Sequence, residues 1–196
     1  MGVDHTRGPP GRSLRGMGTP QPAQTAETAQ SPQSAQTPRM QIWKAAPEVL
    51  KGMYAFQQAA SAQGLEPAVQ ELVKIRASQL NKCAFCLDMH LAEAREQGED
   101  QLRLDLVVAW EEAGTLFTER EQAALALTEA VTVLTDGHVP DEVYARAARH
   151  FDEGELAALI SQIVAINAWN RFAVTTRSVP QSLAARERAQ GHGAGA

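Results

Sequence analysis

The stretch that decides the fold of this chain runs from Glu71 to His90 and reads ELVKIRASQLNKCAFCLDMH. It contains the only two cysteines, Cys83 and Cys86, which form a C-x-x-C, and His90 follows four residues after the second cysteine. Positions i, i+3 and i+7 share one face of a helix, so this spacing predicts that the two thiols and the imidazole lie together. Two thiols that can close a disulfide, with a base one turn away, are typical of a redox site.

Outward from this stretch, the pattern of apolar residues is helical. Hydrophobic residues make up 44% of the chain but aromatic residues only 5%, a composition that favours closely packed helices over sheets. Pro47 and Pro67 suit the first positions of helices, and Gly64 and Gly98 suit their ends. The sequence has neither an alternating strand pattern nor a glycine-rich phosphate loop. The predicted fold class is therefore all-α, a compact helical domain.

Several boundaries follow from local signals. A helix from Pro67 to Leu80 precedes Asn81, which we expect to be the N-cap of the cysteine helix. A short helix is predicted from about Glu99 to Trp110. Capping signals at 118–121 and 152–155 precede two further apolar runs, and the Asp-Gly pair at 136–137 predicts a turn between them.

The chain divides into three parts by composition. Residues 1–39 hold six of the ten prolines with many Gln, Thr, Ser and Gly, and we expect them to be a disordered extension. Residues 40–180 form the predicted helical domain. Residues 181–196 are expected to be a flexible C-terminal tail.

Charge and hydropathy exclude some classes of partner. The net charge of −5 argues against nucleic acid. The most apolar segment, Leu156 to Val174, is interrupted by polar residues, so we expect no membrane span and a cytoplasmic protein. Its apolar side chains cover more than one face. They predict either a subunit interface or a central helix buried within the monomer, and the sequence favours neither.

A helix-terminal thiol and a nearby base suggest how the site would work. If Asn81 is the cap, Cys83 lies in the first helical turn, where the helix dipole lowers the pKa of a thiol. Neutral His90 would take the proton of Cys86. A chain reversal near residues 78–81 would bring the carboxylate of Glu71 back to His90, fixing its tautomer.

Other interpretations of these residues stay open. The cysteines could be two small core residues, or they could bind zinc together with His90, although a structural zinc site needs a fourth ligand. Glu71 could be a solvated helix residue that pairs with Lys74. Redox chemistry is the interpretation that we favour.

The same residues resemble the alkylhydroperoxidase AhpD core, part of the carboxymuconolactone decarboxylase-like superfamily. The resemblance covers residues 40–180 and rests on Glu71, RASQLN at 76–81, CAFC at 83–86, His90, FTERE at 117–121, AAL at 123–125 and INAWNR at 166–171. It implies an all-helical fold that assembles into homotrimers or homohexamers. It also implies a thiol peroxidase and disulfide reductase activity that needs no cofactor and no metal.

The resemblance implies a role for each site residue. Glu71 and His90 form a proton relay for Cys86, which attacks an organic hydroperoxide and becomes a sulfenic acid. Cys83 resolves this acid to a disulfide, which a dithiol partner, either a lipoyl protein or a thioredoxin-like protein, then reduces. The founding peroxidases carry a histidine where this chain has Phe85. A disulfide reductase or a thiol redox sensor is therefore an alternative, and a decarboxylase-type lyase is a third.

Overall fold

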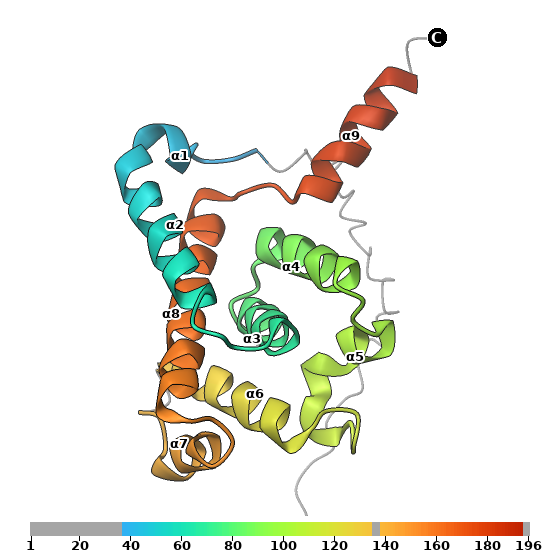
Figure 1. The fold of residues 1–196 in the computed structure, drawn as a ribbon. Helices are drawn as coiled ribbons and strands as arrows, with labels where there is room; N and C mark the ends of the chain where they lie inside the picture. The colour runs from blue at the N-terminus through green and yellow to red at the C-terminus, as the bar shows by residue number, and fades with distance from the viewer. Residues whose placement is uncertain (1–36, 135–137, 194–196) are drawn as a thin grey trace, which may run out of the picture. The chain divides into compact units, whose positions relative to one another are not determined.

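The structure is a computed structural model, and it describes residues 37–134 and 138–193. Within these ranges the chain is helical and contains no strand (Figure 1). The helices are α1 (Ile42–Ala45), α2 (Pro47–Ser61), α3 (Pro67–Leu80), α4 (Ala84–Glu96), α5 (Gln101–Leu106), the 3₁₀ helix η1 (Val107–Glu112), α6 (Glu119–Thr132), α7 (Asp141–Ala148), α8 (Glu153–Thr176) and α9 (Gln181–Gly193). The predicted all-α class is confirmed.

Helix α3 lies in the middle of the fold and packs against α4, α6 and α8 (Figure 1). Its apolar residues Leu72, Val73 and Ile75 are almost completely buried. Polar residues of the same helix are buried as well, among them Glu71 and Lys74. A helix that is covered on all sides can hold polar groups only where they are paired, so its buried charges mark a site.

The apolar helix α8 is buried mainly within the protein itself. Leu159, Ile163 and Ile166 are at most 1% exposed, which supports the central-helix interpretation for this part of the sequence. Val164 points outward instead and is 46% exposed. No described helix, α8 included, is long and apolar enough to cross a membrane.

Most of the predicted helix boundaries are correct. Thr118 and Asp152 each cap a helix through a full capping box, with Glu121 and Glu155 as the reciprocal partners. The short helix predicted up to Trp110 is split into α5 and the 3₁₀ helix η1. The predicted Asp-Gly turn at 136–137 lies outside the described residues.

The predicted N-cap of the cysteine helix is wrong. Asn81 is the C-cap of α3, and the side chain that caps α4 is Cys83. The amide of Asn81 is already used, because its Nδ2 donates to Asn167 and Asn170 of α8 at 2.9 Å each. The chain then passes through Lys82 in the left-handed region (φ 54°) before α4 begins.

The C-terminal segment also differs from the prediction. Residues 181–193, expected to be part of a flexible tail, form helix α9. Asp88 of α4 accepts a hydrogen bond from the backbone N–H of Ser182 at 2.9 Å and so satisfies one of the free donors at the start of α9. The predicted disordered extension, residues 1–39, lies almost entirely outside the described residues.

Candidate active site

The turn between α3 and α4 positions the two cysteines. The backbone N–H of Cys83 donates to the carbonyl of Ser78 at 2.9 Å, which fixes the first cysteine against the end of α3. The left-handed Lys82 costs about 1–2 kcal/mol relative to ordinary helical backbone and makes this tight reversal possible. Cys83 and Cys86 are free thiols, 1% and 2% exposed.

The two thiols interact, and their pKa values shift in opposite directions. The hydrogen bond from the Cys86 thiol, the backbone N–H of Cys86 at 3.4 Å and the amide of Asn170 together outweigh burial and lower the pKa of Cys83 to about 7. The same contact to Cys83, together with burial, raises the pKa of Cys86. Ionisation near neutral pH therefore leaves a thiolate on Cys83 and a thiol on Cys86.

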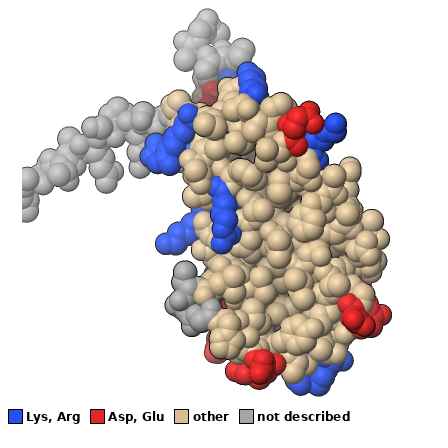
Figure 2. Space-filling view, turned by 90° about the vertical axis from the view of Figure 1, so that its left-hand side faces the viewer, with Lys and Arg blue, Asp and Glu red and all other residues tan. Residues whose placement is uncertain are grey.

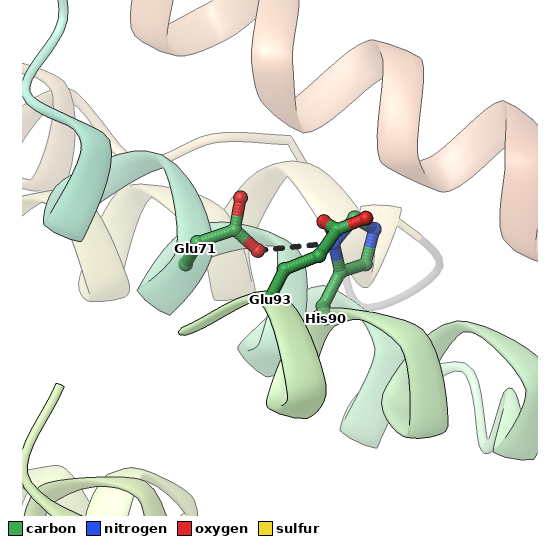
Figure 3. Close-up of side chains that lie close together, drawn as sticks. All are labelled: Glu71, His90 and Glu93. Carbon is green, nitrogen blue, oxygen red and sulfur yellow. Dashed lines mark hydrogen bonds and ion pairs between the residues drawn. The ribbon is translucent and has the colours of Figure 1, made fainter. Parts of the chain in front are cut away.

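The structure brings Glu71 and His90 into direct contact. Glu71 of α3 places Oε2 3.0 Å from Nδ1 of His90 on α4 (Figure 3). Its Oε1 accepts a hydrogen bond from Nζ of Lys74 at 2.7 Å. The pairing of Glu71 with Lys74, which the sequence analysis kept as an alternative, is thus present together with the contact to His90. Nδ1 of His90 also lies 3.0 Å from Oε2 of Glu93.

These contacts shift the pKa values of both partners. Burial alone would raise the pKa of Glu71, but the hydrogen bond to His90 and the charge of Lys74 outweigh it and lower that pKa. Burial alone would lower the pKa of His90, and the two carboxylates outweigh it and raise that pKa. Both shifts favour the ionised forms, a carboxylate on Glu71 and an imidazolium on His90, whereas the sequence analysis expected a neutral histidine.

A pocket of about 460 Å³ opens over this cluster. Its polar side includes Cys86, His90, Lys74 and Glu93. Much of the remaining lining, called here the aromatic wall, is apolar and comes from α1, α2, α4 and α8: Ile42, Trp43, Leu50, Tyr54, Phe85, Met89, Trp169 and Phe172.

The aromatic wall is internally packed. The rings of Tyr54 and Trp169 have centroids 5.0 Å apart, and those of Trp169 and Phe172 are 6.4 Å apart. Of the two cysteines, only Cys86 lines the pocket. An apolar molecule in this pocket would therefore meet Cys86 and His90, while Cys83 lies behind them.

Sequence reasoning missed two residues of the site. Asn170 of α8 is fully buried, donates to Ser78 at 3.0 Å and lowers the pKa of both thiols. It belongs to the INAWNR stretch, but no chemistry had been assigned to it. Glu93 follows His90 by three residues, a helical spacing that could have indicated the contact.

The described residues contain one cluster of three possible metal ligands, formed by Glu71, His90 and Glu93. Neither cysteine belongs to it. The predicted alternative of a zinc site made by the two thiols and His90 therefore gains no support from the arrangement of the side chains.

Comparison with known proteins agrees with this arrangement. The Carboxymuconolactone decarboxylase family matches residues 47–130. One similar solved structure is that of a protein of unknown function from Agrobacterium tumefaciens, with a suggested role as the antioxidant defence protein AhpD. It is 37% identical to this chain in sequence, and the TM-score is 0.71. The match covers 74% of this chain and 98% of the other chain. The chain belongs to the AhpD-like carboxymuconolactone decarboxylase superfamily.

Two further proteins are similar to the chain. The uncharacterized protein YdfG of Bacillus subtilis (strain 168) is 38% identical over 136 residues, which are 69% of this chain and 92% of that protein. The second is a solved AhpD core structure, that of an uncharacterized peroxidase-related protein from Ralstonia eutropha JMP134. It is 20% identical in sequence with a TM-score of 0.62, and the match covers 72% of this chain and 75% of the other chain. The second likeness shows the fold alone. The resemblance stated from the sequence is confirmed at the level of the superfamily.

Proposed function

We propose that this AhpD-like protein is a cysteine-dependent alkyl hydroperoxide reductase. The observation that carries the proposal is the contact between Glu71 and His90, buried beside a pocket that Cys86 lines. The apolar wall suits the organic part of a hydroperoxide. The polar side offers a sulfur nucleophile and a protonated imidazole for the oxygen atoms.

The proposed cycle begins with a proton transfer between the two thiols, against the direction of their pKa values, which hold the resting thiolate on Cys83. The Cys86 proton moves to the Cys83 thiolate, so the Cys86 thiolate faces the pocket. Its sulfur attacks the terminal oxygen of the hydroperoxide, the O–O bond breaks, and the imidazolium of His90 protonates the departing alkoxide to an alcohol. Cys83 then attacks the sulfenic acid on Cys86, and the disulfide forms with loss of water.

A dithiol closes the cycle by reducing the disulfide. We propose a lipoyl protein or a thioredoxin-like protein as this partner, as the resemblance implies. Such a cycle requires a compartment that keeps thiols reduced, so the cytoplasmic location expected from the sequence remains part of the proposal.

The proposal is tested by counting thiols. The reduced protein is incubated with cumene hydroperoxide, and residual peroxide and free thiols are measured over time. We expect one peroxide to be consumed for every two thiols lost, and dihydrolipoamide to restore both thiols. Persistence of both thiols with no loss of peroxide would falsify the proposal.

One observation favours a second candidate, a disulfide reductase or thiol sensor with negligible peroxidase activity. Phe85 lines the pocket where the founding peroxidases carry a histidine, so this site has one polar group fewer beside the sulfur. Rapid reduction of insulin disulfides with no peroxide consumption would identify this function. A lyase of the decarboxylase type would instead remain active after loss of both cysteines.

We also propose a homotrimer or homohexamer. Figure 2 shows the face that carries α1 and α2, where charged side chains are sparse over much of the surface. Exposed apolar residues lie on α2 and α8, among them Val49, Phe56 and Val164, at 55%, 39% and 46% exposure. Burial of these side chains between subunits would be favourable. A monomeric mass in solution would rule the assembly out.

A further inference from the structure

Two carboxylates converge on a single imidazole nitrogen. Oε2 of Glu71 and Oε2 of Glu93 each lie 3.0 Å from Nδ1 of His90 (Figure 3). Glu71 comes from α3, whereas His90 and Glu93 are one turn apart on α4. One nitrogen carries at most one proton, so the two carboxylates compete for a single hydrogen-bond donor. The arrangement exceeds what a two-residue proton relay requires.

The spacing of these atoms is close to that of neighbouring ligands around a metal ion. The three ligand atoms lie within 4.8 Å of one another. A tetrahedral ion bound at about 2.0–2.2 Å from imidazole nitrogen and carboxylate oxygen holds neighbouring ligands about 3.3–3.6 Å apart. Both distances from Nδ1 to carboxylate oxygen are 3.0 Å, so an ion could enter if the side chains moved apart by about 0.3–0.6 Å.

We propose that Glu71, His90 and Glu93 bind a divalent transition-metal ion of the Zn²⁺ type in place of the Nδ1 proton. One imidazole and two carboxylates are ligands that suit such an ion. Lys74 holds Oε1 of Glu71 at 2.7 Å and leaves Oε2 directed at His90. With a neutral imidazole, the two carboxylates and Lys74 carry a net charge of −1, which favours a dication.

The pocket gives an ion a route to this site. His90 and Glu93 both line it, and the Glu93 side chain is 44% exposed. Three protein ligands beside an open pocket leave coordination positions for water or a small ligand, unlike a closed structural site. Neither thiol takes part, which separates this site from zinc binding by the C-x-x-C.

The metal site has a consequence for peroxide reduction, and this consequence rests on the proposed function. A bound ion occupies Nδ1 of His90 and Oε2 of Glu71, the atoms that link the two residues. The imidazole could then no longer act as an imidazolium toward a departing alkoxide. Metal binding would therefore inhibit peroxide reduction, and a chelator would reverse the inhibition.

Calorimetric titration with Zn²⁺ tests the site apart from the thiols. The protein used carries Cys83→Ser and Cys86→Ser, so that sulfur cannot bind the ion. We expect one Zn²⁺ per chain, and binding at least about tenfold weaker after Glu93→Gln. Glu96→Gln is the matched control, because Glu96 is an exposed carboxylate on the same helix and lies outside the cluster. No binding to the cysteine-free protein, or equal binding by Glu93→Gln, overturns the proposal.

A second measurement uses the wild-type chain in case the cysteine-free variant does not fold. Co²⁺ bound by nitrogen and oxygen lacks the intense sulfur charge-transfer absorption of a thiolate site. We expect Co²⁺ uptake without this absorption, and loss of uptake in Glu93→Gln. Uptake that is insensitive to Glu93→Gln overturns the metal site. The thiol count with cumene hydroperoxide is unaffected by that result, so the two proposals fail independently.

Discussion

Oε2 of Glu71 and Nδ1 of His90 lie 3.0 Å apart although the two residues are 19 positions apart in the chain. Each belongs to a different helix, and the reversal through Lys82 sets α4 against α3 so that the two side chains meet inside the protein. Both oxygens of Glu71 have partners there, Lys74 on one side and His90 on the other. The carboxylate thus compensates two cationic groups at once.

This double pairing makes Glu71 important for stability. Glu71→Ala leaves the ammonium of Lys74, which is 8% exposed, without its carboxylate. We expect the free energy of unfolding in urea to fall by about 3–5 kcal/mol. The control is Glu48→Ala, which breaks an exposed pair with Lys51 at 3.7 Å and should cost less than about 1 kcal/mol. Equal losses in the two variants would contradict this account of the buried pair.

The positions of the two cysteines predict different phenotypes. Cys86 lines the pocket, so Cys86→Ser should abolish peroxide consumption. Cys83→Ser should permit a single turnover and leave a sulfenic acid on Cys86, detectable by dimedone labelling and mass spectrometry. Mild and equal effects of the two substitutions would contradict the assigned roles.

The interaction between the two thiols predicts that Cys83 titrates near neutral pH. The pKa of Cys83 is lowered from 9.0 to about 7, so the ultraviolet absorbance of one thiolate should rise as the pH increases through about 7. Because the folded-state pKa lies below the unfolded value, the thiolate adds stability that is fully present above about pH 9 and is lost as the pH falls through about 7. Cys83→Ser should remove this transition. A wild-type protein with no thiolate change between about pH 6 and 8 would contradict it.

The aromatic wall predicts a preference for bulky hydroperoxides. Trp169 contacts both Tyr54 and Phe172, so Trp169→Ala removes the middle of the wall. We expect kcat/KM for cumene hydroperoxide to fall by about tenfold or more, and that for hydrogen peroxide to change little. Tyr144→Ala is the control, since Tyr144 is an exposed aromatic residue of α7 that does not line the pocket. Parallel losses for both peroxides would show that the wall does not select substrates.

The sequence was sufficient for the fold class and for the expectation that Glu71 meets His90. The C-x-x-C, the following His90 and a carboxylate on the preceding helix carry strong local signals, and helix periodicity places them together. The cap of α4 was predicted incorrectly, because Asn81 forms hydrogen bonds with α8, a long-range contact that no local pattern reveals. Asn170 was missed for the same reason, since its role depends on packing between helices far apart in the chain.

Because the sulfur of Cys83 caps α4, a change in the oxidation state of this sulfur would also affect the backbone at the start of the helix. The Sγ that accepts the N–H of Cys86 is also one of the two atoms that a disulfide would join. A disulfide sulfur is neutral and a much weaker acceptor than a thiolate, so oxidation would release the first turn of α4. This turn lies beside Phe85 and the pocket, and hydrogen exchange of the Cys86 amide would then be faster in the oxidised protein. Through such loosening, a dithiol partner could distinguish the oxidised chain from the reduced one by shape as well as by reactivity.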